Sequence, residues 1–189
     1  MQVLQLDSNG VPQAWLWPEA AATYYATDSV SWTVGAILTT MRGGMNARSG
    51  RQSTIDLHPI IAVTGCSPVN LFDAVPSLTN RKLFARDRFV CAYCGSVHPG
   101  GHGLTRDHIY PRGLGGIDHW LNCASACLSC NSRKACRSPE DAGMPLLFAP
   151  YVPSVFEDYL LRGRNIRGDV HGWLASRVGR NSRWYMPRH

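Results

Sequence analysis

The sequence predicts an α+β fold that is organised around a cysteine-rich centre. Short segments with alternating apolar and polar residues, such as 30–34, are typical of strands, and they are interspersed with short segments of helical spacing. Six of the seven cysteines lie between Cys91 and Cys136. A disulfide scaffold would distribute its cysteines along a secreted chain, so this clustering favours metal binding.

Composition and hydropathy exclude several classes of protein. Hydrophobic residues make up 44% of the 189 residues and charged residues 17%, a balance that suits a packed core rather than a disordered chain. No run of about 18 apolar residues occurs, so we expect no membrane span. The start of the chain, MQVLQLDSNG, has no basic region and no long apolar stretch. We therefore expect no secretory signal and a cytoplasmic protein.

Positive charge is concentrated in the centre and the tail of the chain. Residues 1–80 hold three Arg or Lys against five Asp or Glu, whereas 81–150 hold nine against five and 151–189 hold seven against three. Only Lys82 and Lys134 among the 19 basic residues are lysines. Because arginine pairs bidentately with phosphate, this bias fits a polyanionic partner. A GC-rich genome, which favours Arg codons, would produce the same bias.

The first 78 residues predict a small mixed module that is rich in strands. Pro18 followed by Glu19 is typical of the first turn of a helix, which we expect over 18–26. Residues 41–53 contain Gly and polar residues with three Arg and no acidic residue, and we expect a mobile loop there. The strands expected in this module are 3–6, 15–17, 30–34 and 54–63.

Residues 150–189 predict a basic, short helical extension. Apolar residues recur with helical spacing in two places, at Val155, Tyr159 and Leu160 and again at Val170, Trp173, Leu174 and Val178. Glycines interrupt both patterns, so we expect one or two short helices on the core with arginines facing outward. We expect the end of this tail, and the loop 41–53, to contact phosphate.

Two CxxC pairs in the central segment, residues 79–149, predict a metal centre. In each pair, two intervening residues let both sulfurs of a tight turn point at one ion, and Gly95 supplies the turn of the first pair. Four thiolates satisfy tetrahedral Zn²⁺ with no open position, which makes a structural site. The alternative is two unrelated thiol pairs in a reducing cytosol. The predicted zinc ligands are Cys91, Cys94, Cys127 and Cys130.

The remaining cysteines are Cys66, Cys123 and Cys136. Cys123 lies four residues before Cys127 and would be a competing ligand. For all three, we favour the role of a small buried apolar residue.

The segment between the two cysteine pairs predicts a strand, a loop and a returning strand, followed by a helix. We expect the strands at 104–109 and 122–128, the loop at 112–116, and a helix that opens at residue 130. This order would bring the end of the first strand onto the start of the helix. Asp107, His108 and Asn131 would then surround one small pocket.

Four stretches of this segment together resemble the HNH endonucleases of the ββα-metal, treble-clef class. The stretches are RKLFARDRFVCAYCG, LTRDHIYPRGLGGIDHWLN, CLSCNSRK and SPEDAGMPLL. The resemblance covers residues 80–148 and implies a zinc-stabilised core of that class. The β-rich module would precede this core, and the helical extension would follow it.

The resemblance also implies how a phosphodiester would be hydrolysed. His108 would be the general base that activates water, since neutral imidazole is available at physiological pH. Asp107 and Asn131 would hold one divalent cation, Mg²⁺ or Mn²⁺, that polarises the scissile phosphate. Many members of the family have His at the position of Asn131, and the amide oxygen should favour oxygen-preferring ions.

Further residues would support the reaction. Asn122 would brace the loop through backbone hydrogen bonds and so orient His108. We expect Arg112, Arg133 and Lys134 to bind substrate phosphate, the last two from the first turn of a helix.

The function predicted from the sequence is a metal-dependent DNA endonuclease, acting on double-stranded DNA in a bacterial or phage-infected cell. A zinc-stabilised nucleic-acid-binding module without catalysis is an alternative, although a pure binder would not need Asp107, His108 and Asn131 together. An RNA-directed nuclease is a second alternative. The sequence leaves open whether two copies assemble into a homodimer.

Overall fold

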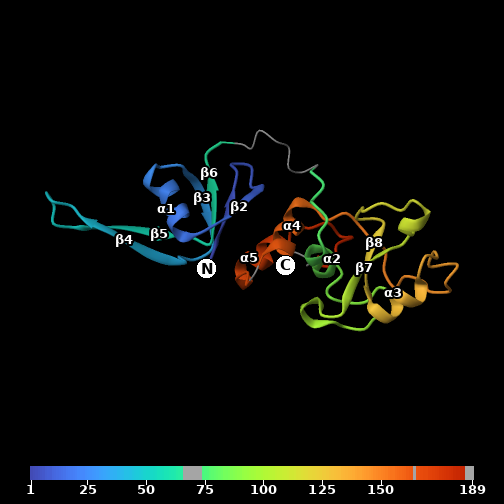
Figure 1. Cartoon of the computed structure of the whole chain (residues 1–189). Coiled ribbons are helices and arrows are strands. Elements are labelled where there is room, and N and C mark those ends of the chain that lie inside the picture. Colours follow the sequence, from blue (N-terminus) through green and yellow to red (C-terminus); the bar gives the residue numbers. More distant parts are fainter. Residues whose placement is uncertain (66–73, 164, 186–189) are drawn as a thin grey trace. The chain divides into compact units, whose positions relative to one another are not determined.

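The chain forms two compact units in a computed structural model (Figure 1). The structure describes residues 1–65, 74–163 and 165–185. The first unit comprises Met1–Ala74 and Gly163–Leu174, and the second comprises Val75–Arg162 and Ala175–His189. Our division into three segments stays a prediction. None of the helices in the described residues is long and apolar enough to cross a membrane.

A four-stranded sheet in the order β2-β1-β6-β3 forms the centre of the first unit. The central pair, β1 and β6, is parallel, and both outer pairs are antiparallel. Its strands are β1 (Val3–Leu6), β2 (Pro12–Leu16), β3 (Val30–Val34) and β6 (Ile60–Val63), and α1 (Pro18–Ala26) follows β2. The strands predicted at 3–6 and 30–34 and the helix at 18–26 are therefore confirmed.

The core of the first unit forms where the apolar strand β6 meets α1. All four residues of β6 are buried, as expected for a central strand between two neighbours. Val3, Ala21 and Ile61 are completely buried in one cluster, so α1 packs its Ala face on the sheet. Burial of this apolar surface is the main stabilising contribution in the unit.

The prediction of a mobile loop at 41–53 is wrong, because this segment forms most of a β-hairpin. β4 (Thr39–Met45) pairs antiparallel with β5 (Gln52–Leu57). Asn46 closes the turn, since its Oδ1 accepts hydrogen bonds from the backbone N–H groups of Arg48 and Ser49. The single strand predicted at 54–63 divides into β5 and β6 at Pro59, whose ring nitrogen has no N–H for a ladder.

The second unit contains the predicted order of strand, loop, strand and helix. β7 (Leu104–His108) pairs antiparallel with β8 (Cys123–Cys127), and α3 (Leu128–Lys134) follows directly. The other elements of this unit are α2 (Asn80–Arg86), two short 3₁₀ turns η1 (Pro99–Gly101) and η2 (Arg112–Leu114), and α4 (Val155–Arg162). The helix α5 (Gly168–Ala175) belongs to the first unit as far as Leu174.

A buried ion pair joins α2 to the β7–β8 hairpin. Arg86 is fully buried, and its Nε lies 2.8 Å from Oδ1 of Asp87. The guanidinium also donates to the carbonyl oxygens of Trp120 and Cys123, at 2.7 and 2.8 Å. Asp87 in turn accepts the backbone N–H of Ser125 at 2.8 Å. Because every donor is matched to an acceptor, the pair fixes β8 against α2 instead of leaving a buried charge uncompensated.

Candidate active site

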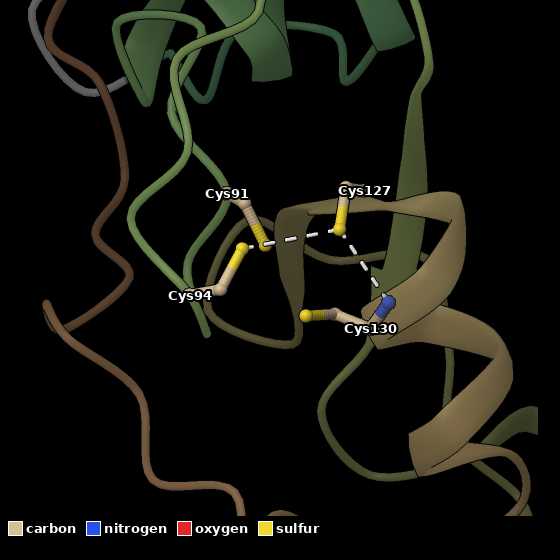
Figure 2. Close-up of side chains that lie close together, drawn as sticks. All are labelled: Cys91, Cys94, Cys127 and Cys130. Atoms are coloured by element: carbon tan, nitrogen blue, oxygen red, sulfur yellow. Dashed lines mark hydrogen bonds between the residues drawn. The ribbon is translucent and has the colours of Figure 1, made fainter.

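Four cysteine side chains converge on one point beside the β7–β8 hairpin (Figure 2). The sulfurs of Cys91, Cys94, Cys127 and Cys130 all lie within 4.8 Å of one another. The two CxxC pairs therefore meet, and the alternative of two unrelated thiol pairs is excluded. Four convergent sulfurs suit a tetrahedral ion such as Zn²⁺, with no position left for substrate.

Local structure explains why these sulfurs converge. Gly95, with a φ of 74°, closes the first knuckle, and its N–H donates to the carbonyl of Cys91 at 3.0 Å. Cys127 ends β8 and caps α3, where its sulfur accepts the N–H of Cys130. Hydrogen bonds from Ser96 lower the pKa of Cys94 to about 6 and so favour its thiolate, the form that would bind a metal, whereas burial raises the pKa of Cys130.

The remaining cysteines differ from expectation in one case. Cys123 is buried, as predicted, and burial raises its pKa. Cys136 is exposed, so the prediction that it is buried is wrong. Cys66 lies outside the described residues.

Asp107 is buried on the side of β7 that faces α3. Its Oδ1 lies 3.1 Å from the ammonium of Lys134, and its Oδ2 accepts a short hydrogen bond from the hydroxyl of Tyr93. The same ammonium donates to the carbonyl of His108 at 2.8 Å. Burial, followed by the contact with Asp107, raises the pKa of Tyr93, which keeps this phenol protonated as a donor.

The placement of Lys134 corrects one expectation about the substrate contacts. Lys134 is completely buried and belongs to the last turn of α3, not the first. Its ammonium is used by Asp107 and the backbone, so it does not present itself to a phosphate. Arg133 is also in that last turn, is exposed, and donates through Nε to the sulfur of Met144.

His108 directs its ring toward a different partner. Its Nε2 lies 2.6 Å from Oδ1 of Asp118, and the other oxygen of that carboxylate lies 2.9 Å from Nη1 of Arg106. The hydrogen bond with His108 and the nearby guanidinium hold the pKa of Asp118 below its usual value. Since side chains alternate along a strand, Arg106 and His108 project away from the face that carries Asp107.

Asn131 lies in α3, and a hydrogen bond to β7 fixes its side chain. Its Nδ2 donates to Oγ1 of Thr105 at 2.8 Å, which orients the amide so that Oδ1 points away from that contact. A cavity of about 160 Å³ lies beside it. The cavity is lined by Arg106, Asp107, His108, Pro111, Arg112, Gly113, Asn131, Ala135 and Cys136. The three residues expected around one pocket thus line the same cavity.

Asn122 spans the loop between β7 and β8. Its Oδ1 accepts the backbone N–H of Tyr110 at 2.8 Å, and its Nδ2 donates to the carbonyls of Tyr110 and Ile117 at 3.1 and 3.0 Å. These are the contacts of a loop brace, as the resemblance implied. Arg112 is exposed in η2 and reaches the cavity.

Sequence reasoning missed two features of the site. Asp118, the partner of His108, stands in a Gly-rich loop ten residues further along the chain, where an acidic residue is usually just solvated. The pairing of Lys134 with Asp107 was also missed, although a lysine and an acidic residue on adjoining elements are a common ion pair. Neither contact can be predicted from the spacing of residues in the sequence, because each depends on how the loop and α3 fold back on β7.

Residues 91–147 match a family model described as HNH endonuclease. The resemblance seen in the sequence is thereby confirmed for this segment, which contains the four cysteines and the cavity. No curated protein and no solved structure matched the chain.

Proposed function

We propose that the second unit is a metal-dependent DNA endonuclease in which His108 activates water. The observation that carries this proposal is one cavity, inside the segment that matches the HNH family, lined by Asp107, His108 and Asn131. These three supply a base and two oxygen donors for a cation, which is the set that phosphodiester hydrolysis requires.

The cavity has the charge to accept a phosphate. Arg106 and Arg112 line it; Asp107 is neutralised by Lys134 and Arg106 is paired with Asp118, so Arg112 is the lining guanidinium that forms no ion pair in the described residues. A guanidinium binds phosphate oxygens through two parallel hydrogen bonds, so Arg112, which is exposed, is the substrate contact that we favour. The net positive lining attracts the anionic backbone before any reaction occurs.

In this proposal Asp118 selects the tautomer of the base. The carboxylate of Asp118 lies 2.6 Å from Nε2 of His108, and we propose that it accepts a hydrogen bond from an N–H at that nitrogen. The neutral imidazole then carries its lone pair on Nδ1, which we propose as the atom that takes the proton from water. Arg106 holds the second oxygen of Asp118 and so limits the rotation of the carboxylate. Asp118 is in this scheme a positioning residue for His108.

The donors for a divalent cation are Asp107 and Asn131. A carboxylate has about four lone-pair sites, so Asp107 retains acceptor capacity beyond its contacts with Lys134 and Tyr93. Asn131 offers an amide oxygen because its NH₂ group is committed to Thr105. Such hard oxygen donors suit Mg²⁺ or Mn²⁺, and a bound cation would stabilise charge on the scissile phosphate and the leaving oxygen. The four cysteines would hold a structural Zn²⁺.

A plasmid assay tests the proposed activity. Purified protein is incubated with supercoiled plasmid in Mg²⁺, in Mn²⁺ and in EDTA, next to His108→Ala and the control His119→Ala. His119 is exposed and does not line the cavity. We expect cleavage by the parent and by the control, and none by His108→Ala or in EDTA. Parental rates in His108→Ala would remove His108 as the base.

One observation favours a second candidate function, a zinc-stabilised DNA-binding module without catalysis. The carboxylate of Asp107 is already paired with the buried ammonium of Lys134, as in a structural ion pair. A parent protein that binds duplex DNA, contains zinc and leaves plasmid intact in both metals would establish this alternative. Cleavage confined to a matched RNA duplex would instead indicate an RNA-directed nuclease.

A further inference from the structure

The hairpin of β4 and β5, residues 39–57, extends beyond the four-stranded sheet of the first unit and is named here the basic arm (Figure 1). Every residue from 42 to 54 is exposed. The base of the arm is anchored, because Met41 and Ile55 pack against the core cluster that contains Leu57. The outer half is therefore ordered by strand pairing and its turn alone, with no core on either face.

The outer half of the arm is strongly cationic. Arg42, Arg48 and Arg51 are its charged residues, and no acidic residue occurs from 39 to 55. Asp56, at the base, accepts a hydrogen bond of 2.6 Å from Thr40. In the described part of the chain, none of the three guanidiniums forms an ion pair.

The register distributes these charges around the arm. Arg42 lies opposite Thr54, and Met45 lies opposite Gln52. Since Gln52 and Thr54 share one face of β5, Arg42 lies on that face and Arg51 on the other. Arg48 occupies the turn. Positive charge thus surrounds the tip instead of forming a stripe on one side.

The charge around a groove of duplex DNA is complementary to the charge of the arm. The major groove is about 12 Å wide and admits a two-stranded ribbon, and a phosphate backbone borders it on each side. A ribbon with guanidiniums on both faces and at its tip meets phosphates on both walls. Near the tip, Gly44 has no atom within 4 Å of the space that a Cβ would occupy, so the backbone there can be approached closely.

A second copy of the chain suits the arm less well. An exposed two-stranded ribbon is a template for pairing with another strand, and proteins commonly protect such edges with charge. Two arms paired edge to edge would bring six guanidiniums together without an acidic partner on either outer half.

We propose that the basic arm binds duplex DNA by entering a groove, with Arg42, Arg48 and Arg51 on phosphates. This inference deepens the proposed function, because it assigns part of the substrate binding to the first unit and requires no step of the cleavage reaction. Its prediction concerns the number of phosphate contacts, which the salt dependence of binding measures.

The test uses the full chain with His108→Ala, so that DNA remains intact. Binding to a 30-base-pair duplex is measured by fluorescence anisotropy at several salt concentrations for three proteins: this parent, the triple variant R42Q/R48Q/R51Q and the charge-preserving triple variant R42K/R48K/R51K. Each lost phosphate contact lowers the slope of log K against log salt by about 0.9. We expect the Gln variant to lose about 2.7 from the slope, and the Lys variant to keep it.

Unchanged salt dependence in the Gln variant would overturn the inference, provided that circular dichroism shows both variants folded. The inference would also be overturned if the Gln variant bound DNA like the parent but had a different oligomeric state, measured by light scattering. The same holds if the variant lost binding to a matched RNA duplex while its binding to DNA was unchanged. A failure of the proposed function is distinguishable, because it appears as absent cleavage by the protein with His108 intact, whatever the slopes are.

Discussion

Replacing Lys134 with Met removes the one cation that contacts the carboxylate of Asp107 in the described part of the chain. The two side chains are 1% and 4% exposed, so water does not screen the charge that remains. Removing one partner of a buried pair costs about 3–5 kcal/mol of unfolding free energy. Because the hydroxyl of Tyr93 still donates to Asp107, we expect about 3 kcal/mol, the lower end of that range.

Urea unfolding at neutral pH, followed by circular dichroism, measures this cost. The matched control is Arg133→Met, which removes a neighbouring cation from the same helix turn. Arg133 is exposed and forms no ion pair in the described residues, so its replacement should change the free energy by less than about 0.5 kcal/mol. Equal stabilities of the two variants would refute the argument that Lys134 compensates a buried charge.

The same variant tests whether Asp107 holds the divalent cation. Without the competing ammonium, Mg²⁺ should bind more tightly to Lys134→Met than to the parent. A ligand at 100 times its Kd stabilises a folded protein by about 2.7 kcal/mol, so Mg²⁺ should restore much of the loss. An identical response of parent and variant to Mg²⁺ would show that Asp107 is not a ligand and would favour the alternative without catalysis.

Three further substitutions follow from individual contacts. Asp118→Asn should lower kcat for plasmid cleavage about 10–100-fold with little change in KM, because it disturbs the orientation of His108; an unchanged kcat would argue against the positioning role. Cys94→Ser should lower the zinc content measured by elemental analysis well below that of the parent, and full zinc content would contradict a four-cysteine site. Burial raises the pKa of Glu157, so the folded state holds its proton more tightly than the unfolded state does. The parent should therefore lose stability relative to Glu157→Gln as pH rises past 4.5, which parallel urea titrations at several pH values would reveal or disprove.

Elements with a strong local signal were predictable from the sequence. The period-two segment 30–34 and the Pro-led helix 18–26 form as expected, since each pattern reports which face is buried. The cysteine cluster was also predictable, because two CxxC turns have few ways to satisfy four thiols other than one ion. The arm over 39–57 was not predictable, because its Gly and Arg residues resemble a loop and its stability comes from pairing between strands.

The candidate site was predictable in its residue types but not in its contacts. The motif named Asp107, His108 and Asn131, and these residues do line one cavity. The partners Lys134 and Asp118 required the fold, because α3 and the loop bring them back onto β7 from distant positions in the sequence. Lysines are also rarely buried, so the residue type alone would place Lys134 at the surface.

Alternation of side chains along β7 limits how the site residues could divide the proposed reaction between them. Asp107 and His108 are adjacent, so their side chains leave opposite faces of the strand, one toward Lys134 and the other toward Asp118. A single ion bound directly by both would require distortion of the strand. Under the proposed function, the α3 side would therefore hold the cation and the loop side would take the proton. In that arrangement, Asp118→Asn should slow cleavage without changing the Mg²⁺ concentration needed for half-maximal rate, and a parallel shift in that concentration would show that the two functions share one ion.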